Sequence, residues 1–160
     1  MGPDKNICWP ILAEDPYFLN EIGGYPVIMG RKTKDYLGYR LIGGQDVVIT
    51  TSVNYRAIGA YIARSLPQAI AMVSHANKVF VIGGSRIFKS AMKKADRIIV
   101  HEFNAILKGH VLFPEIDLKD WCILKQTPWR SKPGDLMQSR VVEYTREKQA
   151  GDLWELLGAA

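Results

Sequence analysis

The chain contains VIMGRKT at residues 27–33 and VFVIGGSRI at residues 79–87, two segments that share one pattern. In each, an apolar, strand-like run is followed by glycine, then by basic and hydroxyl residues, and then by a helical pattern. Glycine lets backbone N–H groups approach a ligand closely, and the N-terminus of a helix favours negative charge. One such segment by itself is most often a tight turn. Two of them, in this order and about fifty residues apart, predict a nucleotide-dependent enzyme.

The sequence around these segments alternates between short apolar runs and amphipathic stretches. We expect strands at residues 26–29, 47–50, 61–63, 79–82 and 97–101, and helices at residues 14–22, 32–37, 65–72 and 86–93. Ser65 is predicted to be an N-cap, because Gln68 follows it by three residues. Alternating strands and helices with short links predict an α/β domain with a mostly parallel central sheet flanked by helices.

The pattern changes towards the C-terminus. Residues 121–127 and 137–144 are strand-like and are joined by a turn-forming segment, so we expect a C-terminal antiparallel hairpin. We place one domain at residues 1–148 and a tail at residues 149–160. The tail has the spacing of a helix start, which favours a short helix packed on the domain over a docking tail for a partner.

The composition restricts the function classes. Of 160 residues, 48% are hydrophobic and 23% are charged, as in an ordinary soluble domain, and we expect neither a membrane-spanning run nor a secretory leader. The net charge is +5, but the basic residues form no long block, so a solvated basic surface is favoured over nucleic-acid binding. Cys8 and Cys122 lie far apart in the sequence and fit reduced thiols in the cytoplasm, whereas a disulfide between them would need proximity in the fold. Without a CxxC motif or a spaced Cys/His cluster, we expect no metal site.

Four motifs, in order over residues 3–146, are similar to those of the dihydrofolate reductase family. They are MGRKT at residues 29–33, VIGG at residues 81–84, FPEID at residues 113–117 after Gly109, and the spacing of Trp9, Glu14 and Phe18. The resemblance implies an NADPH-dependent oxidoreductase that reduces 7,8-dihydrofolate to tetrahydrofolate in one-carbon metabolism. Reducing the pterin C=N bond needs a hydride at carbon and a proton at nitrogen, so the protein must align the two rings and exclude water.

The resemblance also implies roles for individual residues. Glu14 is the carboxylate that accepts two parallel hydrogen bonds from the pterin, with Asp15 as its competitor, and Trp9 is also assigned to catalysis. The residues implied in NADPH binding are Arg31, Lys32, Thr33, Thr50, Thr51, Ser52, Arg64, Gly83, Gly84, Ser85, Arg86 and Ile87. Those implied in substrate binding are Glu14, Phe18, Thr33, Leu37, Leu41, Ile82 and His101. Core packing explains the apolar members of the second set equally well.

The sequence departs from the family pattern at several places. The family begins with a central apolar strand, which residues 1–8 do not supply. Gly44 stands where the family has the arginine that binds the folate tail, and this favours a related pterin or pyrimidine reductase, like that of riboflavin synthesis. Phe88 stands in place of a tyrosine beside the nicotinamide. Together with the missing strand and the apolar tail, it favours a catalytically silent structural or interaction protein. An open sheet edge invites pairing, so we expect self-association, a partner chain or another segment of the chain in that strand's place.

Overall fold

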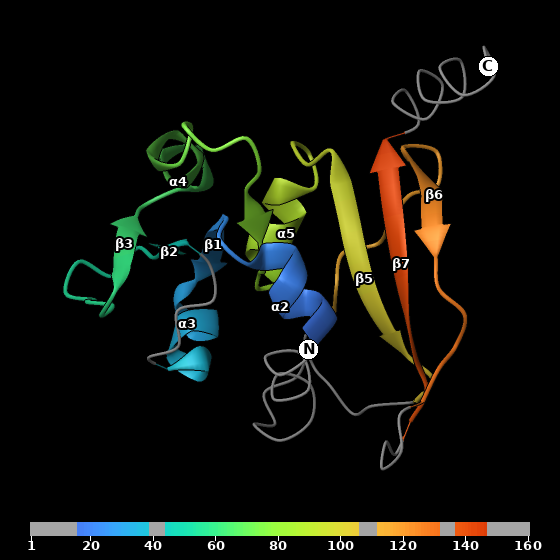
Figure 1. Ribbon diagram of the computed structural model, residues 1–160. Helices are drawn as coiled ribbons and strands as arrows, with labels where there is room; N and C mark the ends of the chain where they lie inside the picture. Colours follow the sequence, from blue (N-terminus) through green and yellow to red (C-terminus); the bar gives the residue numbers. More distant parts are fainter. Residues whose placement is uncertain (1–15, 39–43, 106–111, 132–136, 147–160) are drawn as a thin grey trace. The chain divides into compact units, whose positions relative to one another are not determined.

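The computed structural model describes residues 16–38, 44–105, 112–131 and 137–146. The chain forms two compact units, Met1–Lys93 with Gly109–Pro114 and Lys94–Lys108 with Glu115–Ala160 (Figure 1). The domain boundary expected at residue 148 and the tail beyond it lie outside the described residues.

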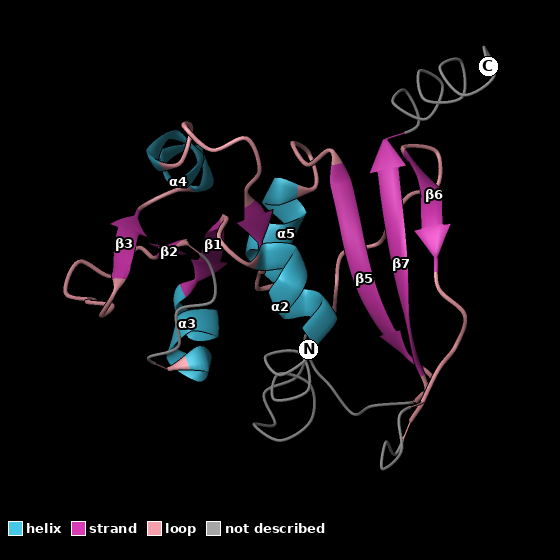
Figure 2. Cartoon of the chain, viewed as in Figure 1, coloured by secondary structure: helices cyan, strands magenta, loops and turns pink. Residues whose placement is uncertain are grey.

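The first unit is built on a four-stranded sheet. Its strands are β1 (Pro26–Gly30), β2 (Gln45–Ile49), β3 (Ala60–Ala63) and β4 (Phe80–Val81), in the order β3-β2-β1-β4 (Figure 2). Every neighbouring pair is parallel, and Val27 lies opposite both Asp46 and Phe80. The predicted α/β fold with a mostly parallel sheet is confirmed, although β4 is shorter than the strand expected at residues 79–82.

Helices pack against both faces of this sheet. They are α2 (Pro16–Ile22), α3 (Arg31–Leu37), α4 (Leu66–Met72) and α5 (Ser85–Ala91). Ile28 packs with residues of α4 and α5 in one apolar cluster, whereas its neighbour Val27 packs with residues of α2 and α3 in another. Successive strand residues point to opposite faces, so a sheet covered on both sides needs apolar residues at consecutive positions. No helix in the described part of the chain is long and apolar enough to cross a membrane.

Local sequence signals set the helix ends. Ser65 Oγ accepts a hydrogen bond from the Gln68 backbone N–H at 3.3 Å, so the predicted N-cap of α4 is confirmed. Helix α3 ends at Gly38, whose φ of 65° is readily adopted by glycine. These caps hold backbone groups that the helices themselves leave unpaired, and they fix where each loop leaves the helix.

The second unit is a three-stranded antiparallel sheet of β5 (Arg97–Phe103), β6 (Trp121–Gln126) and β7 (Ser139–Arg146), in the order β5-β7-β6. The pairing of β6 with β7 confirms the predicted hairpin. The strand predicted at residues 97–101 is longer than expected, and it pairs antiparallel with β7, with Val100 opposite Val142, rather than with a strand of the parallel sheet. The sequence pattern of residues 97–101 identifies a strand but does not specify its partner. β7 pairs with β5 along one edge and with β6 along the other.

Candidate active site

The two glycine segments meet in the folded first unit. Because β1 and β4 are parallel neighbours, the turns that follow them lie side by side. The backbone N–H of Gly30 donates to the carbonyl oxygen of Gly83 at 2.7 Å. Gly83 has a φ of 99°, which L side chains rarely adopt, and a Cβ there would lie 2.5 Å from the Phe88 ring, so any other residue would be strained and would have to displace the ring. The peptide bond between Gly83 and Gly84 is cis.

Cationic and hydroxyl groups surround this contact. Arg31 and Lys32 are exposed at the start of α3, whereas Thr33 is buried. A Cβ placed on Gly84 would lie 3.9 Å from Thr33 Oγ1 with no nearer atom around it, so the missing side chain leaves room beside this hydroxyl. A space next to a hydroxyl, on a helix that begins with two exposed cations, is the kind of place that suits the phosphates of a dinucleotide.

The loop after β2 forms another side of the site. Arg64 Nη1 donates to the carbonyl oxygens of Thr50 at 3.0 Å and Ser52 at 2.7 Å. Thr50 Oγ1 accepts a hydrogen bond from the Ser52 N–H at 3.2 Å. Arg64 was predicted to take part in NADPH binding, and one of its nitrogens also holds the backbone of this loop. The exposed Thr51 lies between the two anchored residues.

The start of α5 packs closely under the glycine turns. The Ile87 Cδ1 atom lies 3.0 Å from where a Cβ of Gly30 would be, so Ile87 supports the turn by contact. Ser85 Oγ donates to the Leu112 carbonyl oxygen at 3.0 Å, and Arg86 is exposed. The residues predicted to bind NADPH therefore lie at one end of the sheet.

Apart from Thr33, which is described above, the predicted catalytic and substrate-binding residues divide into three groups. Phe18, Leu37 and Ile82 belong to the apolar cluster on the α2 and α3 face of the sheet. His101 is half-buried in β5 of the other unit. Glu14, Trp9 and Leu41 lie outside the described residues.

Gly44 lies at the opposite end of the strands. A Cβ on Gly44 would lie 2.5 Å from the Gly24 carbonyl oxygen, and the Gly44 N–H donates to the Tyr25 carbonyl at 2.9 Å. This close approach leaves no room for a side chain, which accounts for glycine at the position of the expected arginine.

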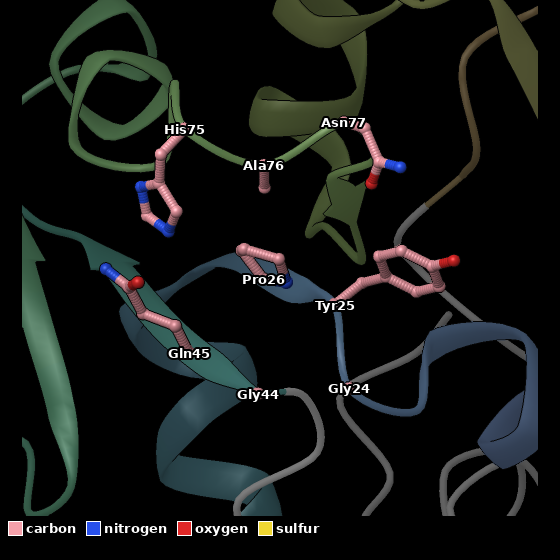
Figure 3. A pocket seen from close by; sticks show the side chains of 8 residues that line it. All are labelled: Gly24, Tyr25, Pro26, Gly44, Gln45, His75, Ala76 and Asn77. Carbon is pink, nitrogen blue, oxygen red and sulfur yellow. The ribbon is translucent and has the colours of Figure 1, made fainter.

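A pocket of about 300 Å³ lies at this amino end, where Pro26 begins β1 and Gln45 begins β2. The imidazole of His75 and the side chain of Gln45 point toward each other there (Figure 3). Ligands of open parallel sheets bind outside the carboxyl ends of the strands. This rule favours the glycine turns over this pocket as the candidate site.

Two polar contacts were missed by the sequence analysis. Lys34 Nζ lies 3.1 Å from Asp46 Oδ2, and both side chains are buried. An acid directly before the apolar run of β2 is the signal that should have indicated a buried cation. The second contact is a hydrogen bond of 2.6 Å from the Tyr55 hydroxyl to Asp35 Oδ1. The described residues contain no group of His, Cys, Asp and Glu suited to a metal ion.

Comparisons with known proteins agree with this fold. The family model for dihydrofolate reductase matches residues 1–146. The chain is 30% identical over 144 residues to dihydrofolate reductase type 3 of Salmonella typhimurium, covering 90% of this chain and 87% of that protein. It is 32% identical over 146 residues to dihydrofolate reductase of Neisseria gonorrhoeae, covering 91% of this chain and 86% of that protein.

A solved structure is similar in fold as well. Dihydrofolate reductase from Enterococcus faecalis, complexed with NADP(H) and RAB-propyl, superposes with a TM-score of 0.74 at 25% identity, over 82% of this chain and 79% of that one. The parallel sheet with its glycine turns and the separate antiparallel sheet fit this architecture. The chain therefore belongs to the dihydrofolate reductase family, whose members are NADPH-dependent oxidoreductases.

Proposed function

We propose that this chain reduces 7,8-dihydrofolate to tetrahydrofolate with NADPH, and that the cofactor phosphates bind at the carboxyl ends of β1, β2 and β4. The observation that carries the proposal is the contact of the two glycine turns, with the Gly30 N–H 2.7 Å from the Gly83 oxygen. The cations of Arg31 and Lys32 stand exposed beside it. Family membership supports both the cofactor and the reaction.

The proposed cofactor residues surround this contact on three sides. Arg31, Lys32 and Thr33 come from α3, Thr50, Thr51, Ser52 and Arg64 from the loop after β2 and the end of β3, and Gly83, Gly84, Ser85, Arg86 and Ile87 from the turn into α5. Bound NADPH supplies the hydride. The chain's own tasks are to bind the phosphates, to align the nicotinamide with the substrate and to exclude water.

The proposed substrate site lies on the face of the sheet covered by α2 and α3. Phe18, Leu37 and Ile82 share one apolar cluster, which supports a nonpolar wall for a pterin ring. Glu14 is proposed to hold the pterin through two parallel hydrogen bonds and to help deliver the proton. Roles for Trp9, Leu41 and His101 rest on the family resemblance.

Cofactor preference tests the phosphate site. We expect NADPH to bind more tightly than NADH when each is titrated against protein fluorescence, because Arg31 and Lys32 can meet the extra phosphate. Arg31→Gln should weaken NADPH binding by about tenfold to a hundredfold, the usual range for a hydrogen bond to a charged group, and should leave NADH unchanged. Lys89→Gln, at an exposed position of α5, is the matched control. Equal affinities for the two cofactors in the wild type would overturn the proposed site.

Turnover tests the carboxylate. Glu14→Gln keeps the side-chain shape but loses the paired acceptor, so dihydrofolate reduction should fall by about 10²–10⁴-fold at neutral pH while NADPH affinity is kept. Asp15→Asn is the control and should have a small effect. Unchanged turnover in Glu14→Gln would reject the assignment.

Association and location are further parts of the proposal. β4 pairs with β1 along one edge, and in the described residues no strand pairs with its other edge. A free edge favours another strand, so we infer that a second copy of the chain or a further segment pairs there. Sedimentation that shows a dilution-resistant monomer, no gain in melting temperature from an added apolar strand peptide, and an experimental structure with no strand in that position would together contradict this inference. The free thiol of Cys122 supports a cytoplasmic location.

A further inference from the structure

Tyr55 connects the two elements that carry the basic part of the proposed cofactor site. It lies in the loop after β2, and its hydroxyl donates a hydrogen bond of 2.6 Å to Asp35 Oδ1 on α3. Its ring packs against the apolar cluster that contains Val48 and Leu37, so the hydroxyl is held from behind. Neither Tyr55 nor Asp35 was among the residues assigned a role above.

Asp35 lies at a position on α3 from which it could pair with the cations of the site. It follows Arg31 by four residues and Lys32 by three, the two spacings at which side chains on a helix are neighbours. An acid at such a position ordinarily pairs with the base. Among the described residues, however, Arg31 and Lys32 make no ion pair, and the Asp35 carboxylate is hydrogen-bonded to Tyr55.

The surroundings of the Tyr55 hydroxyl favour its protonated form. Burial and the hydrogen bond to Asp35 raise the pKa of Tyr55 to about 12, while the positive charge of Arg31 acts in the opposite direction. The hydroxyl therefore keeps its proton and remains a donor.

We propose that Tyr55 is a positioning residue for phosphate recognition, because its hydroxyl holds the Asp35 carboxylate away from Arg31 and Lys32. Both cations then remain available to a phosphate monoester, such as the 2′-phosphate that distinguishes NADPH from NADH. This inference rests on the proposed function. In Tyr55→Phe the carboxylate is released, and a phosphate has to compete with it for Arg31.

Calorimetric binding of two small probes tests the inference without catalysis. Adenosine 2′,5′-bisphosphate carries the distinguishing phosphate, and adenosine 5′-phosphate lacks it. Tyr55→Phe should weaken binding of the bisphosphate by about two- to fivefold, the range set by an exposed ion pair, and should leave the monophosphate unchanged. Adding Asp35→Asn to Tyr55→Phe should restore bisphosphate binding to the wild-type value, because no carboxylate remains to compete.

Two further variants separate the ways in which the idea can fail. Asp35→Asn should bind the bisphosphate at least as tightly as the wild type, which also covers the case in which Tyr55→Phe folds poorly. Arg31→Gln should weaken the bisphosphate selectively. Suppose that Arg31→Gln weakens binding of the bisphosphate selectively. If Tyr55→Phe then changes the binding of both probes equally, or if adding Asp35→Asn to Tyr55→Phe does not restore bisphosphate binding, Tyr55 has a merely structural role and the inference is overturned. If Arg31→Gln does not affect the bisphosphate, the proposed cofactor site itself is wrong.

Discussion

Lys34 and Asp46 form an ion pair almost sealed from water, and replacing Lys34 with Met measures what the pair contributes. The Nζ and Oδ2 atoms are 3.1 Å apart, and the side chains are 4% and 0% exposed. At this separation the attraction is about 5 kcal/mol for an effective dielectric constant of about 20. Much of that attraction offsets the cost of removing both charges from water.

In Lys34→Met the attraction is lost while the Asp46 carboxylate stays buried. We expect the free energy of unfolding to fall by about 3–5 kcal/mol, the usual cost of removing one partner of a buried pair. The free energy of unfolding of a domain is about 5–15 kcal/mol in total, so this loss should be easily measured by urea denaturation followed by circular dichroism. Lys89→Met, at an exposed position of α5, is the control and should change stability by less than about 0.5 kcal/mol.

The double variant Lys34→Met/Asp46→Leu provides the sharper test. Replacing a buried ion pair with packed apolar residues is often neutral or stabilising, so this variant should recover most of the lost stability. A single-variant loss below about 1 kcal/mol would refute the reasoning. So would a double variant as unstable as the sum of its two singles, because the charges would then not be coupled.

Gly44→Ala should lower the free energy of unfolding by about 1–3 kcal/mol, as measured in urea, because its Cβ would lie 2.5 Å from the Gly24 oxygen. Ser65→Ala should cost about 1 kcal/mol through the lost cap of α4, whereas Ser65→Asp, which keeps an acceptor, should keep most of that stability. The pKa of Tyr55 is raised on folding from 10.0 to about 12, so its contribution to stability is complete below pH 10 and is lost as the pH rises through about 12. Unfolding curves at neutral pH and at about pH 11 should therefore differ more for the wild type than for Tyr55→Phe, and equal differences would contradict the assignment.

Much of the first unit could be predicted because its signals are local. The cap at Ser65 and the glycine at position 38 set helix ends through neighbouring atoms. The consecutive apolar residues of β1 and β2 indicate strands buried on both faces. The glycine pair at 83–84 marks a place where two backbones approach.

The remaining features depend on which residues meet across long distances in the sequence. The pairing of β5 with β7 joins segments about forty residues apart, and nothing within β5 specifies that partner. The contact between Tyr55 and Asp35 spans 20 residues and depends on the path of a loop. The same holds for Arg64, because its two backbone acceptors exist only once the loop after β2 has folded.

The order of the second sheet has a consequence for how the chain is made. β7 follows β5 and β6 in the sequence but lies between them in the sheet, so both outer strands leave the ribosome before their shared neighbour exists. β5 begins at Arg97 and β7 at Ser139, an interval that takes roughly 2–8 s at ordinary elongation rates. Until β7 appears, β5 and then β6 lack the strand that each pairs with in the described sheet, and such edges are open to contacts with other nascent chains. A premature stop just before Ser139 would therefore leave two separate strands and not a smaller sheet.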